Sequence, residues 1–380
     1  MIKLKVTFTL LVLSPLVIAA GLIMGCKKEA QNESVTLTDS SARKFDLENL
    51  QVVTNTEAKV RDDFMAEIRA SVLKGDFQGL EKSAENFRTR KERFESGYWK
   101  LRAFYLAFGA TPENTGWPEW LGKLQQWKTQ YSDSITPRLA LAGAYCGYAL
   151  AARGQDWGYK VSDEAAKQTD ERLRASFNYL HEAKDFLNHE NDYGFYGIVL
   201  RDCMWAGMGR TSYDKIFDSA IRNAPDYSVI YEYKAYYLLP RWFGQRGEWQ
   251  TFAKAMSERK DFPESDEIFG RCAIYLQTLG LFYEDFAYGD KTWEELKSSF
   301  HAIEKHYPES LEIKSIDCLL STEMRDYKEA REQMILLGGK IDLSVWDNKG
   351  HFIRIAKWLN NDDATLEQLR QSFIVRYKRN

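Results

Sequence analysis

Histidine and acidic side chains are the first candidates for chemistry, because imidazole and carboxylate groups are common metal ligands. In the stretch YLHEAKDFLNHEN, His181, Asp185 and His189 are spaced four apart and would share one face of a helix. No further ligand is identifiable for this group, and the same pattern is common on the solvent face of an amphipathic helix. We therefore predict that the chain binds no metal ion and no cofactor.

Two other groups of residues raise the question of metal or acid–base chemistry. In HAIEKHY, His301, Glu304 and His306 are poorly spaced for one site, because histidines five apart point to different faces of a helix. Glu284 and Asp285 in FYEDFAYGD could provide the two carboxylates that carbohydrate-cleaving enzymes use. Adjacent residues of a helix point about 100° apart, however, so we expect this pair to be a solvated edge.

Motifs for nucleophilic catalysis and phosphate binding are absent from the sequence. It contains no GxSxG nucleophile elbow, no HExxH zinc helix and no GxxxxGK[ST] phosphate loop. The glycine-rich stretch GMGR, residues 207–210, is expected to be a turn between two helices. We predict that the protein is not an enzyme.

The stretch KAYYLLPRWFGQRGEW contains the most distinctive grouping of residue types. Four of its side chains could form a binding site: Arg241, Trp242, Arg246 and Trp249. In that site Arg241 would bind a carboxylate or another anion through its planar guanidinium. The alternative is a corner, because Pro240 ends a helix, the two glycines permit a turn, and Trp249 opens the next helix. We expect a corner that can also border a binding surface.

The N-terminus has the pattern of a secretory signal peptide, with two early lysines followed by an apolar segment at about residues 6–24. The sequence LIMGCKK then resembles the lipobox of bacterial lipoproteins, in which signal peptidase cleaves before a cysteine that is diacylated. Gly25 and Cys26 fit these two positions. Acyl chains on Cys26 would anchor the protein stably to a membrane. The alternative is an uncleaved membrane helix of roughly 19 apolar residues.

Charge and the residue after the cysteine bear on the location of the protein. An aspartate directly after the cysteine would resemble an inner-membrane retention signal, but the residue at this position is Lys27. We therefore expect an outer-membrane location facing the periplasm in a Gram-negative host. Residues 1–25 carry two lysines and no acid, so their removal would change the formal charge from −3 to −5. Acids and bases are interspersed along the chain, and this pattern argues against nucleic-acid binding.

The chain divides into three predicted parts. Residues 1–25 form the signal peptide, residues 26–57 form the lipidated cysteine and a polar, flexible tether, and residues 58–380 form one folded domain. The sequence is 44% hydrophobic, which is sufficient for a large core.

Helical periodicity dominates the predicted domain, and no convincing strand pattern is visible. In YDKIFDSAIRNAPDY the apolar residues recur at i, i+3, i+4, i+7 and i+8 from Tyr213, and Pro225 ends the pattern. Four stretches place a Gly or Asp turn directly before an aromatic residue that opens a helix: KGDF, QRGEW, YGDKTW and MRDY. The turns NAPDYS, FPESDE and HYPESLE separate such units. The last of these turns resembles a junction between tetratricopeptide repeats.

The spacing of these units predicts the fold class. Trp249, Trp293 and Tyr327 lie 44 and 34 residues apart, so the repeats are not of fixed length. We predict an all-α fold, an irregular α-solenoid of tetratricopeptide-like helical hairpins. Such hairpins bury their apolar faces against one another and curve around a concave groove. We expect the groove to carry the function.

Five cysteines are present, and only Cys26 has a predicted role. An oxidising envelope permits disulfides, yet no CxxC or other close pair occurs. We expect buried free thiols, with one long-range disulfide as the alternative, at the remaining positions: Cys146, Cys203, Cys272 and Cys318.

Part of the chain resembles a known family. The run from Tyr213 to Ala253, with its distinctive LLPRW followed by two glycines, and the run RLALAGAYCGYALAARG from Arg138 to Gly154 resemble the bacterial family called domain of unknown function 4034. The resemblance covers roughly residues 60–300. It implies a helical-repeat fold and no particular activity.

These features predict a lipid-anchored envelope protein that binds another protein or a peptide and catalyses no reaction. The alternative is a glycan-binding or glycan-cleaving envelope protein, because 11 tryptophans and 21 tyrosines could provide stacking surfaces for sugars. The same aromatic residues at helical spacing also suit a packed core.

Overall fold

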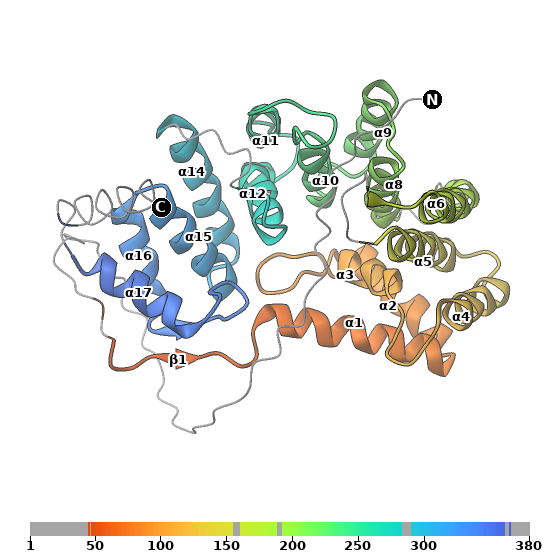
Figure 1. The fold of residues 1–380 in the computed structure, drawn as a ribbon, viewed down its shortest axis with the longest axis horizontal. Helices are drawn as coiled ribbons and strands as arrows, with labels where there is room; N and C mark the ends of the chain where they lie inside the picture. Colours follow the sequence, from red (N-terminus) through yellow and green to blue (C-terminus); the bar gives the residue numbers. More distant parts are fainter. Residues whose placement is uncertain are drawn as a thin grey trace.

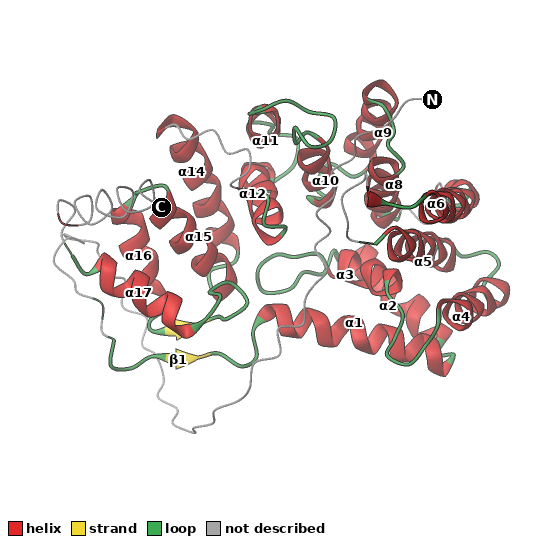
Figure 2. Ribbon diagram, in the orientation of Figure 1, coloured by secondary structure: helices red, strands yellow, loops and turns green. Residues whose placement is uncertain are grey.

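The computed structural model describes residues 45, 47–154, 160–187, 192–282, 290–361 and 365. The predicted signal peptide, the cleavage position Gly25 and the lipidation position Cys26 lie outside these residues. Nearly all regular structure in the described residues is α-helical, with two short strands (Figure 2). The predicted all-α class is confirmed.

Helices fill the first half of the described chain. They are α1 (Glu57–Lys74), α2 (Phe77–Arg90), α3 (Lys100–Leu106), α4 (Trp117–Gln130), α5 (Thr136–Arg153), α6 (Asp163–Lys184) and α8 (Tyr193–Trp205).

The second half continues in the same way. Its helices are α9 (Arg210–Asn223), α10 (Val229–Tyr237), α11 (Glu248–Ser257), α12 (Ile268–Thr278), α14 (Asp290–His306), α15 (Leu311–Glu323), α16 (Tyr327–Leu337) and α17 (Lys349–Leu359). The strands are β1 (Gln51–Val52) and β2 (Lys340–Ile341).

Helices that follow one another in the chain pack against one another, which is the arrangement of a helical-repeat solenoid. From α5 to α17, every described helix contacts the next described helix. Helix lengths range from 7 residues in α3 to 22 in α6, so the repeat is irregular, as the uneven spacing of aromatic residues predicts. In Figure 1 the helices from α2 to α17 follow an arch.

Capping residues explain where the helices begin. The Asp76 and Asp326 carboxylates accept hydrogen bonds from the first-turn amides of α2 and α16, at 3.0 and 3.1 Å. The Ser310 hydroxyl does the same for α15 at 3.2 Å. These bonds satisfy amides that have no partner inside the helix. Helix α9 ends at Asn223, two residues before Pro225.

The arch is closed by contacts between the two ends of the described chain. Helix α1 runs along the open side of the arch, and β1 lies beside the blue C-terminal helices (Figure 1). Strand β1 pairs in parallel with β2, with Gln51 opposite Lys340 and Val52 opposite Ile341. The Arg61 guanidinium of α1 binds both carboxylate oxygens of Glu312 in α15, at 2.6 and 2.8 Å. The solenoid is therefore clasped and not open-ended.

The structure differs from the predicted tether of residues 26–57 over its last part. The Asn360 side chain accepts a hydrogen bond from the Phe45 amide at 2.7 Å and donates one to the Phe45 carbonyl at 3.0 Å. The Phe45 ring packs edge-on against Phe352 of α17. Leu47 and Leu50 also pack against the apolar core of α15–α17. These apolar residues dock because the C-terminal hairpin leaves one side of its core uncovered. The name strap is used below for residues 45 and 47–53.

Candidate functional site

The stretch with the most distinctive residues, Lys234–Trp249, is a corner between α10 and α11. Helix α10 ends at Tyr237, and Pro240 lies in the following turn. The Trp242 ring packs edge-on against Trp205 and Tyr236, and the Phe243 ring stacks on Tyr237 at 4.7 Å. The aromatic residues after the proline therefore hold the bend together.

Glycine is required at the first of the two glycine positions of this corner. A Cβ atom on Gly244 would overlap the backbone carbonyl group of Leu238. Gly247 has a φ of +78°, in the region that favours glycine.

The four predicted binding residues of this stretch do not form one exposed surface. Trp249 is fully buried, and its ring packs against Phe269 and Phe282. Arg241 and Trp242 are half-buried, and Arg246 is exposed. Trp249 cannot contact a partner at the surface, so its prediction as a binding residue is wrong: its apolar area is needed between α11 and α12.

The concave side of the arch is filled by the chain itself. Residues 91–99, between α2 and α3, form a small hairpin in which Arg93 and Trp99 are bridged and the Phe94 amide donates to the Tyr98 carbonyl at 2.8 Å. This hairpin, called the plug loop below, lies inside the arch in Figure 1. The expected concave binding groove is therefore occupied by residues 91–99.

Polar contacts fix the tip of the plug loop. The Ser96 carbonyl accepts a hydrogen bond from Arg271 of α12, and the Ser96 hydroxyl donates one to Glu57 of α1, both at 2.5 Å. Gly97 has a φ of +83°, and a Cβ atom there would collide with Arg271 and Tyr307. The tip is thus locked between the first helix and the second half of the arch.

A small cavity lies beside the plug loop. Its volume is about 60 Å³, enough for a few water molecules and too small for a peptide side chain of any size. Its walls include the Arg61–Glu312 pair and a buried ion pair between Arg102 and Glu232. The charges of these two pairs are engaged with one another and help to hold the arch closed.

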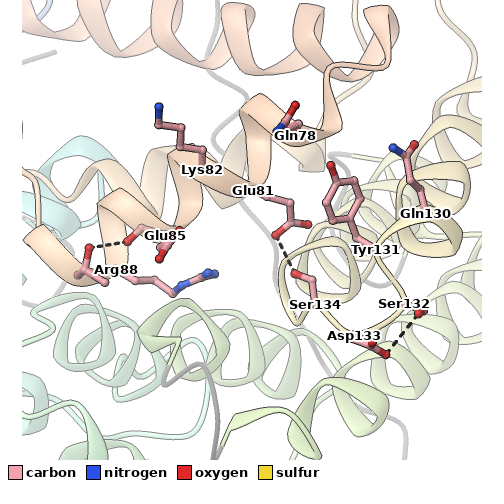
Figure 3. A pocket seen from close by; sticks show the side chains of 11 residues that line it. Gln78, Glu81, Lys82, Glu85, Arg88, Gln130, Tyr131, Ser132, Asp133 and Ser134 are labelled. Carbon is pink, nitrogen blue, oxygen red and sulfur yellow. Dashed lines mark hydrogen bonds between the residues drawn. The ribbon is translucent and has the colours of Figure 1, made fainter.

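An open groove of about 740 Å³ lies elsewhere, between α2 and the turn that connects α4 to α5 (Figure 3). One wall is the exposed face of α2, where polar residues recur at i, i+4, i+7 and i+11: Gln78, Lys82, Glu85 and Thr89. The other wall is formed by residues 130–134. Because its lining is polar on both sides, the groove suits a polar ligand that makes many hydrogen bonds.

Glu81 holds the two walls of the groove together. The Glu81 carboxylate accepts a hydrogen bond from the Ser134 hydroxyl at 2.8 Å (Figure 3). It accepts another from the Trp127 indole, also at 2.8 Å. Glu81 therefore ties α2 both to α4 and to the opposite wall.

Arg88 is a buried residue that lines the groove. Its guanidinium donates to Thr136 at 2.9 Å and to the buried Asp192 carboxylate at 2.8 Å. Tyr105 also donates a hydrogen bond to Asp192. Burial and the neighbouring Asp192 raise the pKa of Tyr105 well above its usual value, so the phenol stays protonated as a donor. The groove is thus built on a rigid, buried network.

The histidines considered for metal binding are placed as follows. His181 and Asp185 lie at the C-terminal end of α6, and His189 lies outside the described residues. His301 lies within 3.0 Å of Glu329, whereas His306 lies within 2.6 Å of Glu267. The two histidines do point to different partners, as their spacing predicts.

Other predicted chemistry is either buried or outside the described residues. Glu284 and Asp285 lie outside them. The cysteines at positions 146, 203, 272 and 318 are free and buried, as expected. Burial raises the pKa of the Cys203 thiol to about 12, so it is unreactive at neutral pH.

The groove and the plug loop were not identified from the sequence. The polar stripe on α2 has a helical period, so it could have been recognised as an exposed face. Nothing local indicates that residues 130–134 would stand opposite it. The plug loop gives no local signal of the helices that its tip contacts, because those helices are distant in the sequence.

Among the described residues, no helix combines the length and the apolar character needed to cross a membrane.

Comparison of the chain with protein-family models, with curated proteins and with solved structures finds no match, so the resemblance to domain of unknown function 4034 stays a prediction.

Proposed function

We propose that this chain is a lipid-anchored protein of the bacterial envelope that binds a segment of a partner protein and catalyses no reaction. The observation that supports it best is the polar groove between α2 and residues 130–134. Anchoring through Cys26 rests on the N-terminal sequence alone.

The dimensions of the groove suit an extended peptide. From Gln78 to Thr89 the face of α2 is about 16 Å long, at 1.5 Å per residue. An extended peptide of about five residues has the same length, at about 3.3 Å per residue. Main-chain amides of such a peptide need donors and acceptors, and the groove walls carry amide, hydroxyl and charged side chains. A partner of this kind would be polar, because the groove has no deep apolar pocket.

The exposed charges of the groove indicate which partner segment it would prefer. Lys82 and Glu85 are exposed on the α2 wall, and Asp133 is exposed opposite them. With Glu81 and Arg88 engaged in holding the walls, these three side chains are the charges that a partner would meet. Two of the three are acidic, so a segment with a basic residue is favoured.

Site-specific photo-crosslinking in the envelope tests the proposal. A benzophenone side chain at Lys82 or Glu85 should crosslink one reproducible partner, whereas the same group at Lys167, an exposed position of α6, should not. The double charge swap Lys82→Glu with Glu85→Lys should lower partner recovery at least tenfold at unchanged melting temperature. Equal yields from all three positions would exclude the groove. Crosslinking to peptidoglycan strands in place of protein would favour the glycan-binding alternative.

A further inference from the structure

Helices α14, α15 and α16 bring four chemically active side chains together in the C-terminal part of the arch. Glu304 comes from α14, Asp317 from α15, and Glu329 from α16, and His301 lies one turn before Glu304. One nitrogen of His301 and one carboxylate oxygen from each of Asp317 and Glu329 lie within 4.8 Å of one another. Asp317 is fully buried, Glu329 is nearly so, and His301 is exposed at the edge.

The charges of this cluster do not balance within the described residues. Three carboxylates share one imidazole, and no lysine or arginine of the described chain forms an ion pair with Glu304, Asp317 or Glu329. A buried excess of negative charge is costly unless protons or a cation neutralise it.

Gln333 provides a second and independent observation. Its side chain is 2% exposed and reaches into the cluster, where its amide nitrogen lies 3.0 Å from Glu304, 3.3 Å from Asp317 and 3.0 Å from Glu329. An amide nitrogen has only two hydrogens for these three acceptors. The amide oxygen of the same group is buried and has no hydrogen-bond partner among the described residues. One carboxylate oxygen of Glu304 is likewise buried and has no hydrogen-bond partner among the described residues.

The Gln333 amide oxygen and one Glu304 carboxylate oxygen are buried without donors among the described residues, and the cluster has an excess of carboxylates. A ligand that accepts oxygen lone pairs would satisfy both conditions. A cation does this, whereas an anion does not. The imidazole of His301 and the carboxylate of Glu329 are 3.0 Å apart, close to the spacing of about 3.3 Å between two ligands of a tetrahedral zinc ion. One nitrogen ligand among oxygens favours a first-row transition metal over calcium or magnesium.

We propose that His301, Asp317 and Glu329 bind one divalent transition-metal ion of the zinc class. Glu304 supplies a further carboxylate beside it, and the Gln333 amide turns its oxygen toward the ion. His301, at the exposed edge, is on the entry side. The ion joins α14, α15 and α16 and so stabilises the C-terminal hairpins on which the strap docks.

Metal retention by the full-length chain tests this site. The protein is purified in detergent, stripped with EDTA, incubated with zinc chloride alone and dialysed, and its zinc content is measured by mass spectrometry. Wild-type protein should retain about one zinc per chain and show a higher melting temperature with zinc. Asp317→Asn and His301→Gln should each lower zinc affinity at least tenfold and remove the thermal shift.

The control is His181→Gln, which removes an exposed histidine of α6 and should leave zinc retention unchanged. Asp317→Asn keeps the size of the side chain and removes a buried charge, so the variant is expected to fold. A measurement on the wild-type chain does not depend on any variant: bound Co²⁺ should show visible absorption bands of a nitrogen- and oxygen-liganded ion. Absence of zinc retention by wild-type protein, or equal affinity in Asp317→Asn, would show that the cluster only shares protons.

Discussion

Glu57 is the residue at which the closed arch depends most directly on pH. Its carboxylate accepts a hydrogen bond from Ser96 of the plug loop and lies 3.0 Å from Arg61. Burial, together with the nearby Glu312, raises the pKa of Glu57 from 4.5 to about 7. In the folded state the carboxyl group therefore holds its proton to a higher pH than in the unfolded chain.

This shift predicts how stability changes with pH. Between pH 4.5 and 7 the folded state binds more protons at Glu57 than the unfolded state, so this group makes the free energy of unfolding fall as pH rises. Glu57→Gln removes the ionisation and keeps a hydrogen-bonding side chain. Urea unfolding should show equal stability of variant and wild type at pH 4 and a more stable variant at pH 8, by up to about 3 kcal/mol.

A matched control separates this effect from general changes in charge. Glu171→Gln, at an exposed position of α6, should change stability by the same small amount at both pH values. A Glu57→Gln variant whose advantage did not grow with pH would show that the carboxyl group ionises normally.

At the scale of elements, the strap is held by its pairing with β2, by apolar contacts and by hydrogen bonds, of which Asn360 makes two. Asn360→Ala removes both hydrogen bonds to the Phe45 main chain. Two hydrogen bonds of about 1 kcal/mol each give roughly a tenfold or larger increase in opening of the strap. Limited proteolysis should therefore cleave residues 47–53 at least tenfold faster in the variant, with little change in global melting temperature.

The neighbouring asparagine is the control for this experiment. Within the described part of the chain, the Asn361 side chain donates hydrogen bonds to two carbonyls at the end of its own helix, those of Lys357 and Trp358. Asn361→Ala should leave cleavage of the strap near the wild-type rate. Equal acceleration in both variants would attribute the effect to fraying of α17.

Sequence patterns predicted single elements well, and the reason is that their signals are local. The apolar stripe of α9 and its end before Pro225 lie within one stretch of chain, as do the caps at Asp76 and Asp326. The corner after α10 was recognisable because proline and glycine restrict the backbone locally.

The features that the sequence does not predict depend on contacts between elements that are far apart in the chain. Strands β1 and β2 have two residues each, too few for an alternating pattern, so the polar sequence around β1 predicts a tether there. Sequence spacing relates His301 only to Glu304 and His306 of its own helix, whereas Asp317 and Glu329 come from the next two helices. From the sequence, Trp249 could face either a partner or the core. The structure shows that it faces the core, because its ring packs against Phe269 of α12.

At the scale of the whole molecule, the location rests on Cys26. Because two or three acyl chains hold a protein on a membrane stably, we expect acyl mass on the N-terminal peptide of the mature protein and membrane fractionation. Cys26→Ser should abolish both. Lys28→Ala, two residues away, should abolish neither. A mature protein that begins at Cys26 without acyl mass, or that retains residues 1–25, would contradict the lipoprotein prediction.

The contacts between the two ends of the described chain also affect when the arch can close during synthesis. Arg61 and Glu312 are separated by 251 residues, and Phe45 and Asn360 by 315. Closing a loop of about 250 residues costs about 2 kcal/mol more than closing one of about 35. As the chain leaves a ribosome or a secretion channel, α1 emerges early and its partner on α15 late. Helix α1 can pack against α2, α3 and α4 early, but its contact with α15 forms only after the last quarter of the polypeptide has emerged.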